Sequence, residues 1–122
     1  MHTTRIFFAA ASLLFLVLPL EAQDAVKVDA KHYKVDFEND QVRVLRITYG
    51  PGEKSVMHDH PAGMAVFLTD LQVKFTYPDG KTEQVDAKTG QTRFNKAGKH
   101  LPENTGTKPF ELILVELKTK AK

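Results

Sequence analysis

Three histidines offer the clearest chemistry in this chain. His58 and His60 are separated by one residue, and His100 lies much further along. Residues two apart in an extended strand point to the same face, so both imidazoles can bind one ion. His100, from a distant strand, would complete a set of three nitrogen ligands and leave coordination positions open for water or a substrate. Imidazole suits Fe, Cu, Zn and Ni alike, so we expect one divalent transition metal from this group. The alternative is a pair of surface histidines on an exposed strand.

The composition excludes several other kinds of site. The 122 residues include no cysteine, which rules out disulfides, thiolate zinc sites, iron–sulfur clusters and cysteine nucleophiles. Lys and Arg number 17 against 15 Asp and Glu, for a formal net charge of +2. Nucleic acid is not an expected partner, because phosphate binding needs a basic stripe on one face. The length fits one compact domain.

The N-terminal segment has the layout of a secretory signal peptide. One basic residue, Arg5, precedes an uncharged run over residues 6–20, and polarity returns at Glu21. The small residue Ala22 suits cleavage, so residues 1–22 are predicted to be removed. The alternative is an uncleaved anchor, but the run contains Pro19 and is shorter than the roughly 20 residues that cross a bilayer. We therefore expect an exported protein, periplasmic or secreted, with no stable membrane anchor after cleavage.

Short β-strands are the elements expected to position the histidines. Residues 71–77 alternate apolar and polar side chains, and the turn Pro78-Asp79-Gly80 leads into residues 81–85, which predicts a β-hairpin. Residues 110–117 are apolar on both faces in their middle, which predicts a strand between layers. Residues 42–47 also read as a strand, with a phase slip that indicates burial on both faces or a bulge. Further strands are expected at residues 65–68 and 91–94. No amphipathic helix is evident, so the predicted fold class is all-β.

The glycines around the histidines carry a family resemblance. The first cupin motif opens with a glycine, five further residues and two histidines separated by one residue. Gly52 and His58-Asp59-His60 match this opening. The glycine, histidine and asparagine positions of the second motif are occupied by Gly90, Gly98, His100 and Asn104. Over roughly residues 40–117 the chain thus resembles small single-domain bacterial cupins. The resemblance implies a small antiparallel cupin barrel, or double-sheet jelly roll, as the single domain of residues 23–122.

The resemblance has one chemically important departure. The family's first motif supplies a glutamate ligand four residues after its second histidine, and this chain has Met64 there. Met64 can be core filler, since Met usually packs. It can also mark a gap that leaves a three-histidine site, as in some cupin-type dioxygenases. A third interpretation makes its thioether a weak axial ligand, which would favour copper. Loss of the carboxylate weakens the case for a hard ion such as Mn²⁺.

These observations predict an exported cupin-domain protein that binds one divalent transition metal through three histidines. If it is catalytic, the resemblance implies dioxygenase-like chemistry on a small organic substrate. The alternative is a non-catalytic module of the same fold that binds a small ligand or a metal. No separate general base is evident, so the sequence leaves open whether the chain is an enzyme. Exposed edge strands allow a homodimer. The side chains expected to line the cavity are Phe67, Phe75, Phe94 and Leu114.

Overall fold

The computed structural model describes residues 23–119, and the predicted signal peptide lies outside the described residues. In this part of the chain a single turn of helix, α1 (Ala25–Val28), precedes the strands. No helix between residues 23 and 119 is long and apolar enough to cross a membrane. The strands are β1 (Tyr33–Glu38), β2 (Val42–Tyr49), β3 (His58–His60), β4 (Gly63–Phe67), β5 (Leu71–Thr76), β6 (Thr82–Ala87), β7 (Thr92–Asn95), β8 (Gly98–Asn104) and β9 (Phe110–Leu117).

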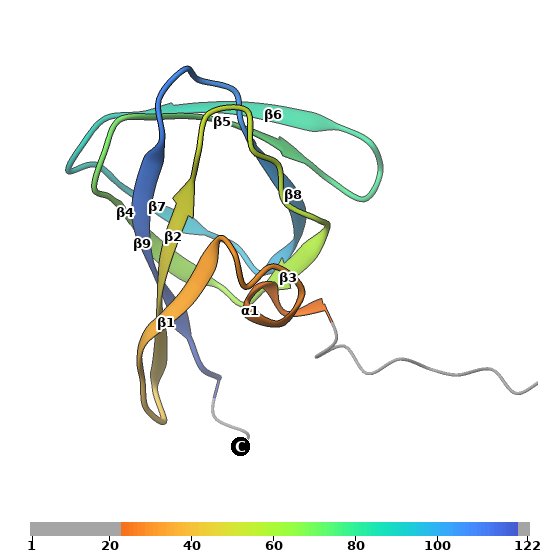
Figure 1. Cartoon of the computed structure of the whole chain (residues 1–122). Coiled ribbons are helices and arrows are strands. Elements are labelled where there is room, and N and C mark those ends of the chain that lie inside the picture. The colour runs from red at the N-terminus through yellow and green to blue at the C-terminus, as the bar shows by residue number, and fades with distance from the viewer. Residues whose placement is uncertain (1–22, 120–122) are drawn as a thin grey trace, which may run out of the picture.

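The strands form two antiparallel sheets around a common interior (Figure 1). One sheet has the order β1-β2-β9-β4-β7 and the other the order β3-β8-β5-β6. Most neighbours within a sheet are distant in sequence, as in a jelly roll, where the chain crosses repeatedly between layers. The helix α1 packs beside β1 and β3 at one end of the barrel (Figure 1). The all-β prediction is confirmed.

The predicted hairpin is confirmed in detail, and the prediction for the final strand is confirmed in part. Strands β5 and β6 pair as an antiparallel hairpin from Leu71↔Ala87 to Thr76↔Thr82. Gly80 has a φ of 85°, which suits glycine, and its N–H donates to the carbonyl oxygen of Tyr77 to close the turn. Strand β9 lies between β2 and β4, which confirms that it is not an edge strand. Its outer residues Ile113 and Val115 are only partly buried, so β9 does not lie between two layers.

Other features of the fold differ from expectation or were not predicted. Along β2 the buried residues alternate regularly, and the irregular register lies in its partner β1, between Val35 and Phe37. A bulge in β1, where two residues oppose one residue of β2, therefore accounts for the shift in register. The sequence analysis did not predict β1, β8 or α1. The two segments without a predicted strand, β1 and β8, bring Tyr33 and His100 to the interior.

The core between the sheets is apolar along most of its length. Leu45, Ile47 and Tyr49 of β2 alternate inward, and every second residue of β9 does the same. That inward row of β9 begins at Phe110 and ends at Glu116, which is only 1% exposed. A carboxylate at the end of an apolar row is unusual, since burying a charge is unfavourable without partners. Its partners lie in the histidine site.

Candidate metal centre

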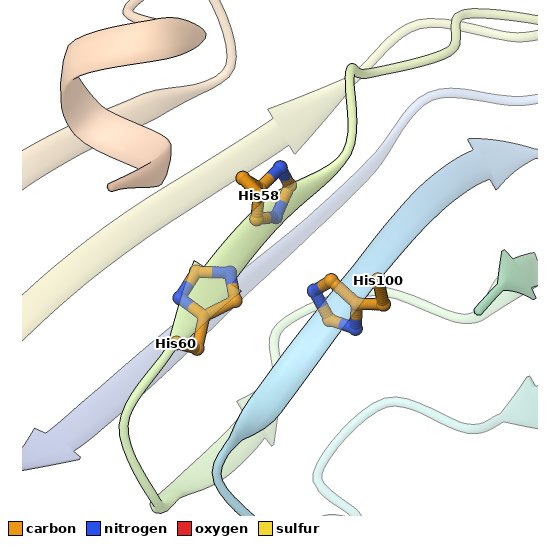
Figure 2. A group of neighbouring side chains, drawn as sticks. All are labelled: His58, His60 and His100. Atoms are coloured by element: carbon orange, nitrogen blue, oxygen red, sulfur yellow. The ribbon is translucent and has the colours of Figure 1, made fainter. Parts of the chain in front are cut away.

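The three histidines predicted from the sequence lie together inside the barrel. Strand β3 carries His58 and His60 on its inner face, and β8 pairs with β3 so that His100 lies directly opposite His58. Figure 2 shows the three rings turned toward one another from these two strands. Ring centroids are 4.7 to 5.1 Å apart, and one ligand atom from each residue lies within 4.8 Å of the others. This spacing suits three ligands of one ion.

Hydrogen bonds to the rings leave the Nε2 atoms facing the centre. His58 Nδ1–H donates to the carbonyl oxygen of Val56 at 2.8 Å, so Nε2 carries the lone pair. His60 Nδ1–H donates to Oε2 of Glu116 at 2.7 Å, which fixes the same tautomer. The Nε2 atom of His100 is buried and has no hydrogen-bond partner among residues 23–119. A buried polar atom without a partner is unfavourable, and a metal ion would satisfy it.

Burial also sets the charge state of the rings. It lowers the pKa of His58 to about 4, with a further contribution from the charge of His60. Burial lowers the pKa of His100 to about 2, and the charges of His60 and His58 act in the same direction. Both rings are therefore neutral near pH 7. Metal ligation requires a neutral imidazole, so these two rings could bind an ion without releasing protons.

A buried carboxylate behind His60 was missed by the sequence analysis. Glu116 accepts from His60 Nδ1–H through one oxygen and from Arg43 Nε–H through the other, each at 2.7 Å. Arg43 and Glu116 are direct partners across β2 and β9. Arg43 also donates to both oxygens of Asp24, at 2.7 and 2.8 Å, and this contact lowers the pKa of Asp24. A carboxylate that holds a ligand histidine is the usual second layer of a metal site.

A signal for Glu116 was present in the sequence. Phe110, Leu112 and Leu114 share its phase in the final strand, so the period of two places Glu116 on the same face as these apolar residues. No comparable signal marks Arg43 or Asp24, because their roles depend on strand register and on the return of the N-terminal segment to the barrel.

Two tyrosines extend the polar interior of the site. Tyr33 and Tyr49 are each 2% exposed, and their hydroxyl oxygens lie 2.6 Å apart. The Tyr33 hydroxyl also lies 3.1 Å from Nε2 of His58. Burial raises the pKa of both phenols, so both are neutral near pH 7 in the metal-free protein. His32, the fourth described histidine, stacks on Tyr49 and bonds Asp29 and Glu53, outside the cluster.

A small cavity adjoins the histidines. It measures about 50 Å³, and its lining includes Phe67, Phe75 and Leu114. The ring of Phe75 stacks on His100 with centroids 4.8 Å apart. An outer hollow of about 420 Å³ shares His60, His100 and Arg93 with the cavity. This hollow is the mouth of the site.

Two predicted site residues lie elsewhere. Phe94 is 54% exposed and lines the outer hollow, while its neighbours Arg93 and Asn95 line the cavity. Alternation along β7 therefore points Phe94 away from the interior. Met64 is 39% exposed, and the buried residues of β4 are those on either side of it. Its side chain lies on the outer face of the sheet, so it is neither core filler nor aimed at the histidines.

Comparison with solved structures identifies the fold. A cupin domain from Bordetella pertussis Tohama I superposes with a TM-score of 0.66 at 21% identity, over 71% of this chain and 92% of that one. A double-stranded β-helix protein from Klebsiella pneumoniae gives 0.56 at 17% identity, over 88% and 100% of the two chains. The oxalate decarboxylase of Bacillus subtilis, which has Mn(II) centres, gives 0.51 at 17% identity, over 68% and 23%. No family model and no curated protein matches the sequence.

The chain therefore has the cupin fold, as the glycine and histidine motifs implied. At these identities the likeness concerns the fold alone. The chemistry rests on this chain's own residues, which place three inward histidines at the point where two strands pair.

Proposed function

We propose that this chain is an exported cupin that holds one divalent transition ion through the Nε2 atoms of His58, His60 and His100. The observation that carries the proposal is the buried Nε2 of His100, which has no hydrogen-bond partner among residues 23–119. It faces the neutral ring of His58 and the ring of His60, which Glu116 holds in place. A buried nitrogen without a hydrogen-bond partner is unfavourable, and an ion at the shared centre would supply the partner that Nε2 of His100 lacks. Here one nitrogen of each ring faces a shared centre.

The donor set narrows the choice of ion. Three imidazole nitrogens favour Fe, Cu, Zn or Ni over hard ions that prefer oxygen. The Mn(II) centres of the Bacillus subtilis oxalate decarboxylase support metal binding by this fold. When bound, the ion would supply a Lewis acid that polarises an oxygen atom of a small ligand.

The chain's own residues define which ligand can reach the centre. The cavity of about 50 Å³ is bordered by aromatic and aliphatic side chains and has room for only a few water-sized groups. A small organic ligand would therefore occupy mainly the outer hollow of about 420 Å³. Phe75 covers one face of His100 and holds that ring in place. At the mouth, Arg93 lies 5.9 Å from the Phe75 ring and bonds Glu83 at 2.9 Å. Its guanidinium would attract an anionic group of the ligand.

Metal analysis of tag-free protein tests the proposal. We expect one equivalent of Fe, Cu, Zn or Ni in the wild type, and none in the double variant His58→Ala, His60→Ala. Lys99→Ala is a matched control, because Lys99 neighbours His100 and points to the opposite face of β8. Failure of all four ions to bind the folded wild type would overturn the proposal.

The metal-loaded protein could have either of two roles, a catalytic one or a non-catalytic one. Dioxygenase-like chemistry predicts oxygen consumption with one of a panel of small diketones, thiols or phenols, dependent on the ion. The non-catalytic alternative predicts ligand binding by calorimetry with no turnover. Among residues 23–119, the small cavity is lined by no carboxylate, while Glu83 lines the outer hollow.

Export is part of the proposal and has its own test. The N-terminal layout of residues 1–22 supports a cleaved signal peptide. Expression of the full chain in a bacterium should yield processed protein in the periplasm or medium, with an N-terminus near Gln23. Unprocessed protein in the cytosol would contradict export without affecting the metal site.

A further inference from the structure

The hydroxyl of Tyr33 lies inside the histidine cluster, although no sequence motif marks it. Its oxygen is 3.1 Å from Nε2 of His58, the nitrogen that faces the proposed ion. The Tyr33 ring centroid lies 4.9 Å from that of His58 and 5.6 Å from that of His60. Tyr33 comes from β1, outside the segment that resembles the cupin motifs, so the family pattern assigns it no role.

The direction of the hydrogen bonds follows from the tautomer of His58. Its Nδ1–H donates to Val56, so Nε2 must accept, and the Tyr33 O–H is the donor. Tyr49 then donates its own proton to the Tyr33 oxygen at 2.6 Å. In the metal-free protein the Tyr33 proton therefore occupies the lone pair that an ion would take.

We propose that the Tyr33 oxygen is a fourth ligand of the ion, in place of the glutamate that the first cupin motif lacks in this chain. The inference rests on the proposed function. Two ligand atoms about 2.1 Å from one ion and at a right angle are about 3.0 Å apart. The 3.1 Å hydrogen-bond distance between the Tyr33 oxygen and His58 Nε2 is close to that separation.

Binding of the ion also removes the partner of the Tyr33 proton. Once His58 Nε2 donates its lone pair to the ion, the buried O–H of Tyr33 loses its acceptor, which is unfavourable. The O–H bond breaks, the proton passes to water, and the oxygen's electron pair binds the ion, with no change of oxidation state. Tyr49 continues to donate to that oxygen and stabilises its negative charge.

Ferric iron is the probe, because iron bound by a phenolate oxygen absorbs visible light by charge transfer. We expect the tag-free wild type to bind one equivalent of Fe(III) with such a band, and tyrosinate modes in resonance Raman spectra excited within it. Tyr33→Phe should lack the band and bind Zn(II), in competition with a chelator, at least about tenfold more weakly. Tyr77→Phe is the matched control and should keep the band, because the Tyr77 hydroxyl bonds Glu83 at 3.0 Å and has no role in the cluster.

The outcomes separate this inference from the proposed function. One equivalent of iron without a charge-transfer band in the wild type would overturn the role of Tyr33 and leave the three-histidine site intact. The wild-type spectrum decides this even if Tyr33→Phe does not fold, which circular dichroism would reveal. A band that persists in folded Tyr33→Phe would also overturn it. Binding of neither iron nor zinc by the wild type would overturn both proposals.

Discussion

Replacement of Glu116 by Gln tests how the protein prepares its histidine site. The carboxylate accepts from His60 and from Arg43, and it is 1% exposed. A glutamine oxygen can accept from one of these donors, but its NH₂ group then faces the other. The variant therefore loses one charge-assisted hydrogen bond and places two donors together in the interior.

The size of the effect follows from these contacts. A hydrogen bond to a charged group contributes about 1.5–3 kcal/mol, so we expect the metal-free variant to lose about 2–3 kcal/mol of unfolding free energy. His60 also loses its fixed orientation, which should weaken metal binding by about 10- to 100-fold. Urea denaturation measures the first quantity, and Zn(II) competition with a chelator measures the second.

Glu111→Gln is the matched control, on the same strand. Glu111 pairs with Arg46, and both side chains are substantially exposed, at 36% and 42%. A surface ion pair contributes about 0–1 kcal/mol, so this variant should stay close to the wild type in stability and in metal affinity. Equal zinc affinity in Glu116→Gln and Glu111→Gln would refute the role of the buried carboxylate in orienting His60.

Three further predictions follow from the same contacts. The metal-free protein should lose stability as pH falls from about 6.5 toward 4, because unfolded His58 and His100 bind protons that their lowered folded pKa values exclude. Each contributes about 1.4 kcal/mol per pH unit, so urea denaturation of His100→Gln should show a shallower pH dependence than the wild type, and equal slopes would contradict this. Gly63→Ala should lower the unfolding free energy by about 1–3 kcal/mol, since the new Cβ would lie 2.5 Å from the carbonyl oxygen of Val115; thermal melting measures this. Asp24→Asn should reduce it by about 1–2 kcal/mol in urea, because a bidentate charged contact is lost, and no change would show that the N-terminal contact is energetically neutral.

Local sequence patterns predicted the hairpin, the central final strand and the histidine cluster. Period two and turn chemistry act over a few residues, so residues 71–87 could be read directly. That His100 joins His58 and His60 was inferred with the help of glycine positions that resemble a known motif, and the pairing of β3 with β8 brings the three rings together. Strand β8 itself lacks apolar alternation, because its polar residues serve the site and its far face meets solvent.

The contacts that orient the histidines could not be read from local pattern. Arg43 meets Glu116 only because β2 and β9 pair in one particular register, across 73 residues of sequence. Tyr33 reaches His58 because it begins the edge strand β1 and is the one residue of that strand whose side chain is buried. Polar side chains of this kind resemble surface residues in a sequence, and only the assembled sheets show that they are buried.

The arrangement of charge supports the proposed metal site even though Met64 stands where the first cupin motif has a glutamate. Three neutral imidazoles leave the charge of a divalent ion uncompensated in a buried place, which is unfavourable. Behind His60, the two carboxylates of Glu116 and Asp24 face one guanidinium, so this group carries one net negative charge. This negative charge lies behind the His60 ring and offsets half of the charge of a divalent ion. A phenolate at Tyr33 would offset the remaining positive charge of the ion, and a neutral ligand could then bind. If Tyr33 stays a neutral phenol, the ion would instead favour an anionic ligand that enters past Arg93. The charge of the ligand that binds best is therefore a direct readout of the state of Tyr33.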